Sequence, residues 1–128
     1  MERVIVGAAI VDGAKLLIQQ RAYPDDAAGL WELPGGRVEP GETEQAALRR
    51  ECAEELAIEV TVGVPVGEDV VLPGGAVLRI YAAALVSGCI PQAVEHKALR
   101  WIAADEVSDV DWLPADRALI PDLEELLA

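Results

Sequence analysis

Apolar runs separated by turn-forming residues indicate where strands form along the chain. Residues 4–11 and 16–20 are rich in apolar side chains, and the pair Asp12-Gly13 between them favours a tight hairpin turn. A strand pair is therefore expected at the start of the fold. Later runs of the same kind predict further strands over residues 58–66, 70–72, 76–86 and 98–102. Residues 22–41 hold three prolines and four glycines without a sustained period, which predicts a loop that doubles back on the sheet.

Two segments have the composition and spacing of helices. Residues 43–57 are rich in Glu, Gln, Ala, Leu and Arg, and Thr43 at their start suits the N-cap position. The tail, residues 117–127, places its leucines at helical spacing, with Pro121 expected in the first turn or at a kink. Strands and helices in this order predict a single domain over residues 1–128, of the α/β (α+β) class, with a mixed sheet covered on both faces.

The first predicted helix carries an acidic stripe. At about 100° per residue, Glu51, Glu54 and Glu55 fall within roughly 100° of arc. Like charges at these spacings destabilise a helix by a few tenths of a kcal/mol per pair, so a divalent cation with oxygen ligands is a natural partner. The upstream glycines Gly35 and Gly36 allow a backbone whose carbonyl oxygens point inward, and this donor set suits Mg²⁺ or Mn²⁺. Taken alone, the three glutamates fit a solvated helix face better than a metal site.

The spacing around this stripe matches a family motif. The Nudix box consists of Gly, five residues, Glu, seven residues, Arg-Glu, an apolar residue, any residue, Glu-Glu, any residue, Gly and an apolar residue. This sequence meets it with Gly36, Glu42, Arg50-Glu51, Cys52, Glu54-Glu55 and Ile58. Ala57 stands where the box has Gly, which affects the turn after the helix. With two further similar stretches, residues 29–36 and 111–116, the chain resembles a MutT-like member of the Nudix family.

The resemblance implies a fold, a reaction and a metal. The fold is the Nudix fold, an α/β/α sandwich with a central mixed β-sheet. The reaction is the hydrolysis of a nucleoside triphosphate at its β-phosphorus, giving a nucleoside monophosphate and pyrophosphate, with Mg²⁺ as cofactor and Mn²⁺ as a substitute. The alternative from another class is a Nudix-fold module that senses a nucleotide without hydrolysing it. Such modules usually lose metal-site glutamates, and this sequence keeps them.

The resemblance also implies roles for single residues. The metal ligands would be the three helix glutamates together with the backbone oxygen of Gly35. Arg50 would orient Glu51 by a charge-assisted hydrogen bond, whereas Glu42 and the glycine that opens the box would support the loop and the helix. Glu95 precedes a predicted strand and stands where relatives have a further acidic ligand or base. An ordinary loop carboxylate is the alternative for this residue.

The expected nucleobase depends on Asp116. MutT-like enzymes for oxidised guanine have Asn at this position, and an Asn amide both donates to O6 and accepts from N7–H of 8-oxoguanine. An ionised Asp only accepts, so it suits the amino group of cytosine or the N1–H and N2 edge of guanine. The chain also resembles the branch that acts on CTP and dCTP, so a cytidine nucleotide is expected, with 8-oxo-dGTP as the alternative. Asp116 also suits the N-cap of the last helix.

Two further residues are candidates for contacts with the substrate. Leu33 is a candidate for the base pocket or the core, and Arg21 for a phosphate contact or the surface.

Charge and composition narrow the partners. A formal net charge of −13, from 10 basic and 23 acidic residues, argues against binding to polymeric nucleic acid or anionic membranes. The apolar run at residues 4–11 is too short for a membrane span and lacks the cleavage pattern of a secretory signal. Cys52 and Cys89 have neither metal nor redox spacing, so free thiols in a reducing cytoplasm are expected, with Cys52 packed as an apolar residue. The expected partner is a small nucleotide, and the expected assembly a monomer or homodimer. The aromatic residues are assigned mainly to the core, with stacking on a ligand as the alternative. The single histidine, His96, is expected to be a loop residue without a partner rather than a general base.

Overall fold

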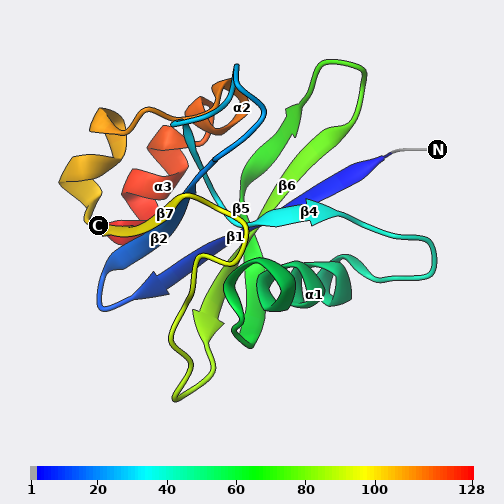
Figure 1. Cartoon of the computed structure of the whole chain (residues 1–128), viewed down its shortest axis with the longest axis horizontal. Coiled ribbons are helices and arrows are strands. Elements are labelled where there is room, and N and C mark those ends of the chain that lie inside the picture. The colour runs from blue at the N-terminus through cyan, green and yellow to red at the C-terminus, as the bar shows by residue number, and fades with distance from the viewer. Residues whose placement is uncertain (1–2) are drawn as a thin grey trace.

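The computed structural model describes residues 3–128, and its strands form a sheet flanked by helices (Figure 1). The strands are β1 (Val4–Asp12), β2 (Lys15–Gln20), β3 (Trp31–Glu32), β4 (Gly35–Arg37), β5 (Val60–Val71), β6 (Val77–Leu85) and β7 (Ala98–Ile102). The helices are α1 (Glu44–Leu56), the 3-10 helix η1 (Ala104–Asp109), α2 (Pro114–Arg117) and α3 (Ile120–Leu127). No helix within residues 3–128 has both the length and the apolar character needed to span a membrane.

The sheet is mixed because β1 runs parallel to β6 and antiparallel to β2 and β4. Its main path is β3-β2-β1-β6-β5, while β4 pairs with β1 and β7 pairs with β2. In the hairpin between β1 and β2, Asp12 pairs with Lys15. The turn residues are therefore Gly13 and Ala14, with φ of 56° and 62°. The turn lies one residue later than the predicted Asp12-Gly13 pair, and its two positive φ angles match the twist of the flanking strands.

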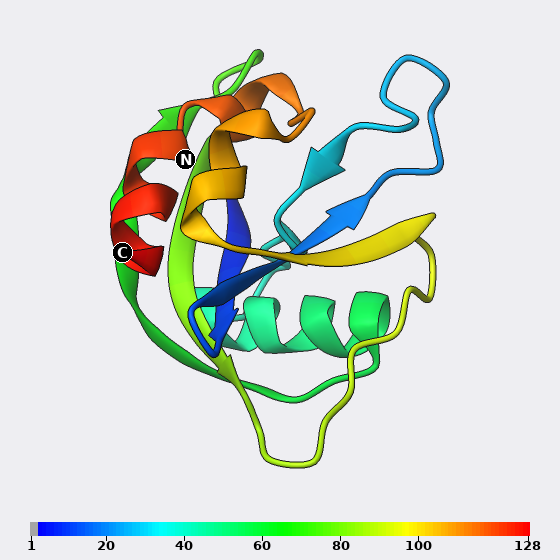
Figure 2. The same cartoon turned by 90° about the vertical axis from the view of Figure 1, so that its left-hand side faces the viewer.

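The core has two parts because the sheet is covered on both faces (Figure 2). On β1, Val6 and Ala8 belong to the cluster that packs under α1, whereas Ala9 belongs to the cluster on the opposite face. Neighbouring residues of a strand point to opposite faces, so one strand serves both clusters. The α1 side includes fully buried Cys52, as expected. On the other side, α3 contributes Leu123.

The ends of α1 are fixed by capping. Thr43 is the N-cap, as predicted, and its Oγ1 accepts a hydrogen bond from Ala46 N at 3.0 Å. At the other end Ala57 adopts a left-handed conformation, with φ 56° and ψ 40°, and donates its N–H to Ala53 O. Alanine thus ends the helix in the conformation that the glycine of the box would adopt more easily.

Three segments differ from the prediction. Residues 22–41 are not loop throughout, because they contain β3 and β4, which pair with β2 and β1. The runs at 58–66 and 70–72 form one bulged strand, β5. The last helix begins at Ile120 rather than residue 117, with Pro121 in its first turn, and η1 and α2 precede it without having been predicted.

Candidate active site

Arg50 gathers three acidic side chains on one side of α1. Its Nε and Nη2 donate to both carboxylate oxygens of Glu42, at 2.8 and 2.9 Å. Its Nη1 donates to Glu51 Oε1 at 2.8 Å and contacts Glu54 Oε2 at 3.4 Å. Nη2 also donates to the carbonyl oxygen of Arg37 at 3.0 Å, which ties α1 to β4. Glu51 and Glu54 therefore converge on one cationic group.

The charge of Arg50 affects its acidic neighbours unequally. Hydrogen bonds from Arg50 lower the pKa of Glu42 to about 2, so this carboxylate stays ionised. Burial raises the pKa of Glu51 and outweighs the opposing hydrogen bond and charge of Arg50. A second cation beside Glu51 would favour its ionised form, because an opposite charge lowers the pKa of an acid.

The glycines of β4 let α1 approach the sheet closely. A Cβ atom on Gly36 would lie 2.5 and 2.6 Å from the two carboxylate oxygens of Glu51. A Cβ atom on Gly35 would overlap the carbonyl oxygen of Val6. Gly35 N also donates to Glu55 Oε1 at 3.1 Å. Glu51 and Glu55 therefore contact the same two-residue segment.

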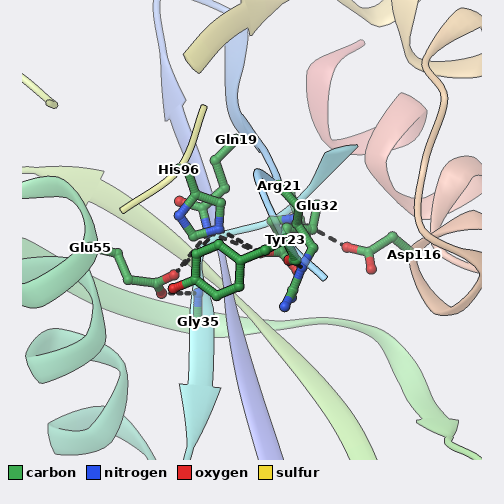
Figure 3. A network of polar contacts seen from close by, with 9 residues as sticks. Gln19, Arg21, Tyr23, Glu32, Gly35, Glu55, His96 and Asp116 are labelled. Atoms are coloured by element: carbon green, nitrogen blue, oxygen red, sulfur yellow. Dashed lines mark hydrogen bonds and ion pairs between the residues drawn. The ribbon is translucent and has the colours of Figure 1, made fainter. Parts of the chain in front are cut away.

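Glu55 belongs to a buried polar cluster that extends beyond the motif (Figure 3). Gln19 Nε2 donates to Glu55 Oε2 at 3.0 Å and to Glu32 Oε2 at 3.3 Å. His96 Nε2 lies 2.8 Å from the same Glu32 oxygen and 3.7 Å from Glu55 Oε2. Glu32 Oε1 accepts from Arg21 Nη1 at 3.1 Å. The cluster thus joins β2, β3, α1 and the segment before β7.

Protonation differs between the two acids of this cluster. Burial raises the pKa of Glu55 to about 7, against the hydrogen bonds that lower it, the one from Gln19 being the largest of these. Burial also acts to raise the pKa of Glu32, but the hydrogen bond from His96 and the charge of Arg21 outweigh it, so the pKa of Glu32 is lowered. Glu32 is therefore the more readily ionised of the two acids.

A shallow pocket opens beside the cluster, lined by Arg21, Ala22, Tyr23, Glu55, Glu95 and His96. Glu95 is exposed there, on the same pocket as Glu55. Tyr23 is 61% exposed, so its assignment to the core was wrong, whereas Trp31, Trp112 and Tyr81 are buried as expected. The ring of Tyr23 stands in front of the cluster in Figure 3. Acidic, basic and aromatic groups therefore surround one opening.

Asp116 lies at the other end of this arrangement from Glu55 (Figure 3). It is 6% exposed, its Oδ2 accepts from Leu33 N at 3.1 Å, and burial raises its pKa to about 7. Asp116 lies inside α2, and Leu119 is the N-cap of α3, so the alternative role of Asp116 as the N-cap of the last helix is wrong. The side chain of Leu33 packs in the core, and its backbone is the part that meets Asp116.

Three residues of the cluster, Gln19, Glu32 and His96, were not indicated by the sequence. His96 was assigned to a loop without a partner, and this was wrong, because it lies 2.8 Å from Glu32 although 64 residues separate them. Glu32, Glu55 and His96 each offer one atom that could bind a metal ion, and within residues 3–128 these three atoms all lie within 4.8 Å of one another. The available signals were the place of Glu32 inside the MutT-like stretch 29–36 and the position of His96 next to Glu95.

Comparison with known proteins places the chain in a family. The NUDIX domain model matches residues 1–125. A Mycobacterium tuberculosis protein provisionally named 8-oxo-dGTP diphosphatase 2 is 50% identical over 130 residues, which cover 99% of this chain and 92% of that protein. The CTP pyrophosphohydrolase of Escherichia coli is 40% identical over 131 residues, which cover 100% of this chain and 94% of that protein. The solution structure of the E. coli ORF135 protein has a TM-score of 0.84 and 38% identity, and covers 100% of this chain and 93% of that one. A match over nearly the whole length, in both sequence and fold, shows that the chain belongs to the Nudix family.

Proposed function

We propose that this Nudix protein is a Mg²⁺-dependent nucleoside triphosphate pyrophosphohydrolase that prefers CTP or dCTP. The observation that carries the proposal is the paired placement of the glutamates of the box: Arg50 holds Glu51, and the Gly35-Gly36 segment contacts both Glu51 and Glu55. The names of the two relatives, a CTP pyrophosphohydrolase and an 8-oxo-dGTP diphosphatase, support the reaction class.

The donor set fits a hard divalent cation. Glu51 and Glu54 already share a cationic neighbour, the guanidinium of Arg50, and the carboxylate of Glu51 occupies the space left by the missing Cβ of Gly36. Carboxylate and carbonyl oxygens are the ligands that Mg²⁺ prefers. The residues that would hold it are Glu51, Glu54, Glu55, the backbone oxygen of Gly35 and, as a further ligand or base, Glu95. When bound, Mg²⁺ neutralises phosphate charge and lowers the pKa of a bound water.

The chain's own residues would bind and orient the substrate. Arg21 is held by Glu32 and by the carbonyl oxygen of Tyr23, yet a third of its side chain is exposed on the pocket, so it can contact a phosphate. Arg50 is fixed by a planar two-bond contact with Glu42 that lysine could not make, and it holds Glu51 through a further bond from Nη1. Water would add to the β-phosphorus while the bond to the α-phosphate oxygen breaks, which yields a nucleoside monophosphate and pyrophosphate.

The base preference rests on Asp116. One of its oxygens accepts from Leu33 N, and the proposal assigns the other to the base. The ionised form only accepts hydrogen bonds and suits the cytosine amino group, whereas the neutral form can also donate, as Asn does. Because burial raises the pKa of Asp116 to about 7, both forms exist near neutral pH. The preference for dCTP over 8-oxo-dGTP should therefore increase as the pH rises from about 6 to about 8.

Initial rates with dCTP, CTP and 8-oxo-dGTP at equal concentration, measured across this pH range, test the base preference. Asp116→Asn should make the ratio independent of pH and shift it towards 8-oxo-dGTP, while Asp111→Asn, at an exposed position nearby, is the matched control. Dominant turnover of 8-oxo-dGTP by the wild type at about pH 8, or the same pH dependence in Asp116→Asn, would contradict the cytosine assignment.

The hydrolase activity itself is tested with Glu54→Gln. Glu54 is 58% exposed in its side chain, so the variant should fold normally, while turnover with Mg²⁺ should fall by roughly 100-fold or more because a metal ligand is lost. Glu59→Gln removes the same charge at an exposed position just beyond α1 and serves as the control. Products should be the nucleoside monophosphate and pyrophosphate. Binding of nucleotides without any hydrolysis by the wild type would support a sensor instead.

Cys52 and Cys89 are free thiols in the structure, and this supports the reducing cytoplasm as the proposed location.

A further inference from the structure

A second set of possible metal ligands lies next to the glutamates of the box. Glu32 and His96 are both outside the motif, yet His96 Nε2 lies 2.8 Å from Glu32 Oε2 and 3.7 Å from Glu55 Oε2. The three ligand atoms all lie within 4.8 Å of one another. The side chains of the three residues are only 11–14% exposed. Two carboxylates and an imidazole are therefore held together away from bulk water.

Gln19 brings an unsatisfied polar atom to this cluster. Within the part of the chain that the structure describes, two buried side-chain polar atoms lack a hydrogen-bond partner, Gln19 Oε1 and His96 Nδ1. Nε2 is the ring atom of His96 that faces the two carboxylates, so an ion between them would leave Nδ1 unchanged and Gln19 Oε1 is the atom that it could satisfy. Gln19 is fully buried. Leaving a buried polar atom without a partner is unfavourable, so Gln19 Oε1 calls for a water, an ion or another ligand.

The amide of Gln19 can donate hydrogen bonds to the carboxylates of the cluster or, when turned over, offer its oxygen to an ion. In the structure its Nε2 donates to one oxygen of Glu32 and one oxygen of Glu55. A half-turn of the amide would direct Oε1 at the same two carboxylates. That orientation is repulsive unless a cation lies between them, in which case the oxygen becomes a further ligand.

The chemistry of the donors selects the class of ion. Imidazole suits Zn²⁺ and its transition-metal neighbours, whereas Mg²⁺ prefers oxygen ligands only. We propose that Glu32, Glu55 and His96 bind a divalent transition-metal ion of the Zn²⁺ type, at a site that shares Glu55 with the proposed magnesium site. The binding does not depend on the proposed hydrolase activity. Because Glu55 is shared, Zn²⁺ and Mg²⁺ should each change the affinity of the protein for the other.

The single histidine of the chain makes the site directly observable. In a long-range ¹H–¹⁵N spectrum of the nucleotide-free protein, every imidazole signal belongs to His96. Addition of Zn²⁺ should shift one ring nitrogen to the resonance of a metal-bound imidazole and saturate at one equivalent, whereas Mg²⁺ alone should not. Imidazole signals that stay at their metal-free positions through the Zn²⁺ titration would overturn the proposal, whatever the enzyme does with nucleotides.

Variants separate this site from other metal-binding groups. His96→Gln and Glu32→Gln should each weaken Zn²⁺ binding, measured by calorimetry, by at least about tenfold, since even the loss of a group that only supports a ligand has that effect. Cys89→Ser removes a partly exposed thiol and should leave the affinity unchanged, and Glu54→Gln should retain the Zn²⁺-induced shift of His96. Equal Zn²⁺ affinity in wild type and His96→Gln, or loss of binding in Cys89→Ser, would place the ion elsewhere.

Discussion

Gly36→Ala should damage the site without damaging the fold. The new Cβ would lie 2.5 and 2.6 Å from the oxygens of Glu51, where ordinary contact begins at 3.4 Å. The carboxylate must therefore move by about 1 Å, which it can do as the end of a flexible side chain, but the 2.8 Å bond from Arg50 is then lost. A displacement of about 1 Å at a functional group costs on the order of 100-fold in rate. We expect a loss of turnover of that size, weaker Mg²⁺ binding, and a change in unfolding free energy below about 1 kcal/mol.

Gly35→Ala is the contrasting variant. Its Cβ would overlap the carbonyl oxygen of Val6 and lie 2.8 Å from Gly7 Cα, both backbone atoms of β1. Since β1 is paired with β4, neither strand can move without breaking that pairing, and we expect a loss of about 3 kcal/mol or more in stability.

Urea denaturation followed by tryptophan fluorescence gives the stability of both glycine variants. Turnover with Mg²⁺, measured where each variant is folded, gives the effect on the site. Gly36→Ala should lose turnover and keep its stability, whereas Gly35→Ala should lose stability. Wild-type turnover in Gly36→Ala, or a loss of stability as large as that of Gly35→Ala, would refute the idea that Gly36 makes room for the carboxylate of Glu51.

Three further changes test the capping, the arginine contact and the buried acid. Ala57→Gly should stabilise the protein by about 0.5–1 kcal/mol, because glycine adopts the left-handed cap with less strain, and an unchanged melting temperature would contradict this. Arg50→Lys keeps the charge but not the planar contacts; we expect about tenfold weaker Mg²⁺ binding and a stability loss of about 1 kcal/mol or less, measured by calorimetry and urea denaturation. Burial raises the pKa of Asp116 from 3.8 to about 7, so its neutral form stabilises the fold below pH 3.8 and this stability is lost as the pH rises to about 7. Asp116→Asn keeps an acceptor for Leu33 N and should be more stable than the wild type by up to about 4 kcal/mol above pH 7, with the difference vanishing at low pH.

Local patterns predicted the parts of the fold that depend on local interactions. The N-cap at Thr43, the helix after it and the strand at 98–102 follow from composition, period and capping chemistry, and all three are present. The strands β3 and β4 have two and three residues, too few to show a period, and they exist because β2 and β1 pair with them. Short strands in a segment rich in proline and glycine are thus products of long-range pairing.

The residues of the site also fall into those that local patterns predict and those that only the assembled fold brings together. The glutamates of the box share one helix and were found through their spacing, whereas the contact between Glu32 and His96 joins residues 64 positions apart. No periodicity links such a pair, because it forms only after β2, β3 and β7 are assembled. The unexpected exposure of Tyr23 has the same origin, since its segment lies over the pocket rather than in either core.

The stretch 31–36 connects the two ends of the proposed site. Leu33 N bonds Asp116, Glu32 belongs to the buried cluster, and Gly35 N bonds Glu55. These contacts lie on one short piece of backbone that is hydrogen-bonded to the sheet on both sides of Leu33. The distance between the residue proposed to read the base and the residues proposed to hold the metal is therefore set by sheet geometry rather than by a mobile loop, which is the condition for placing a phosphate chain of fixed length against the ions. A segment that looks irregular in the sequence is thus the most constrained part of the site.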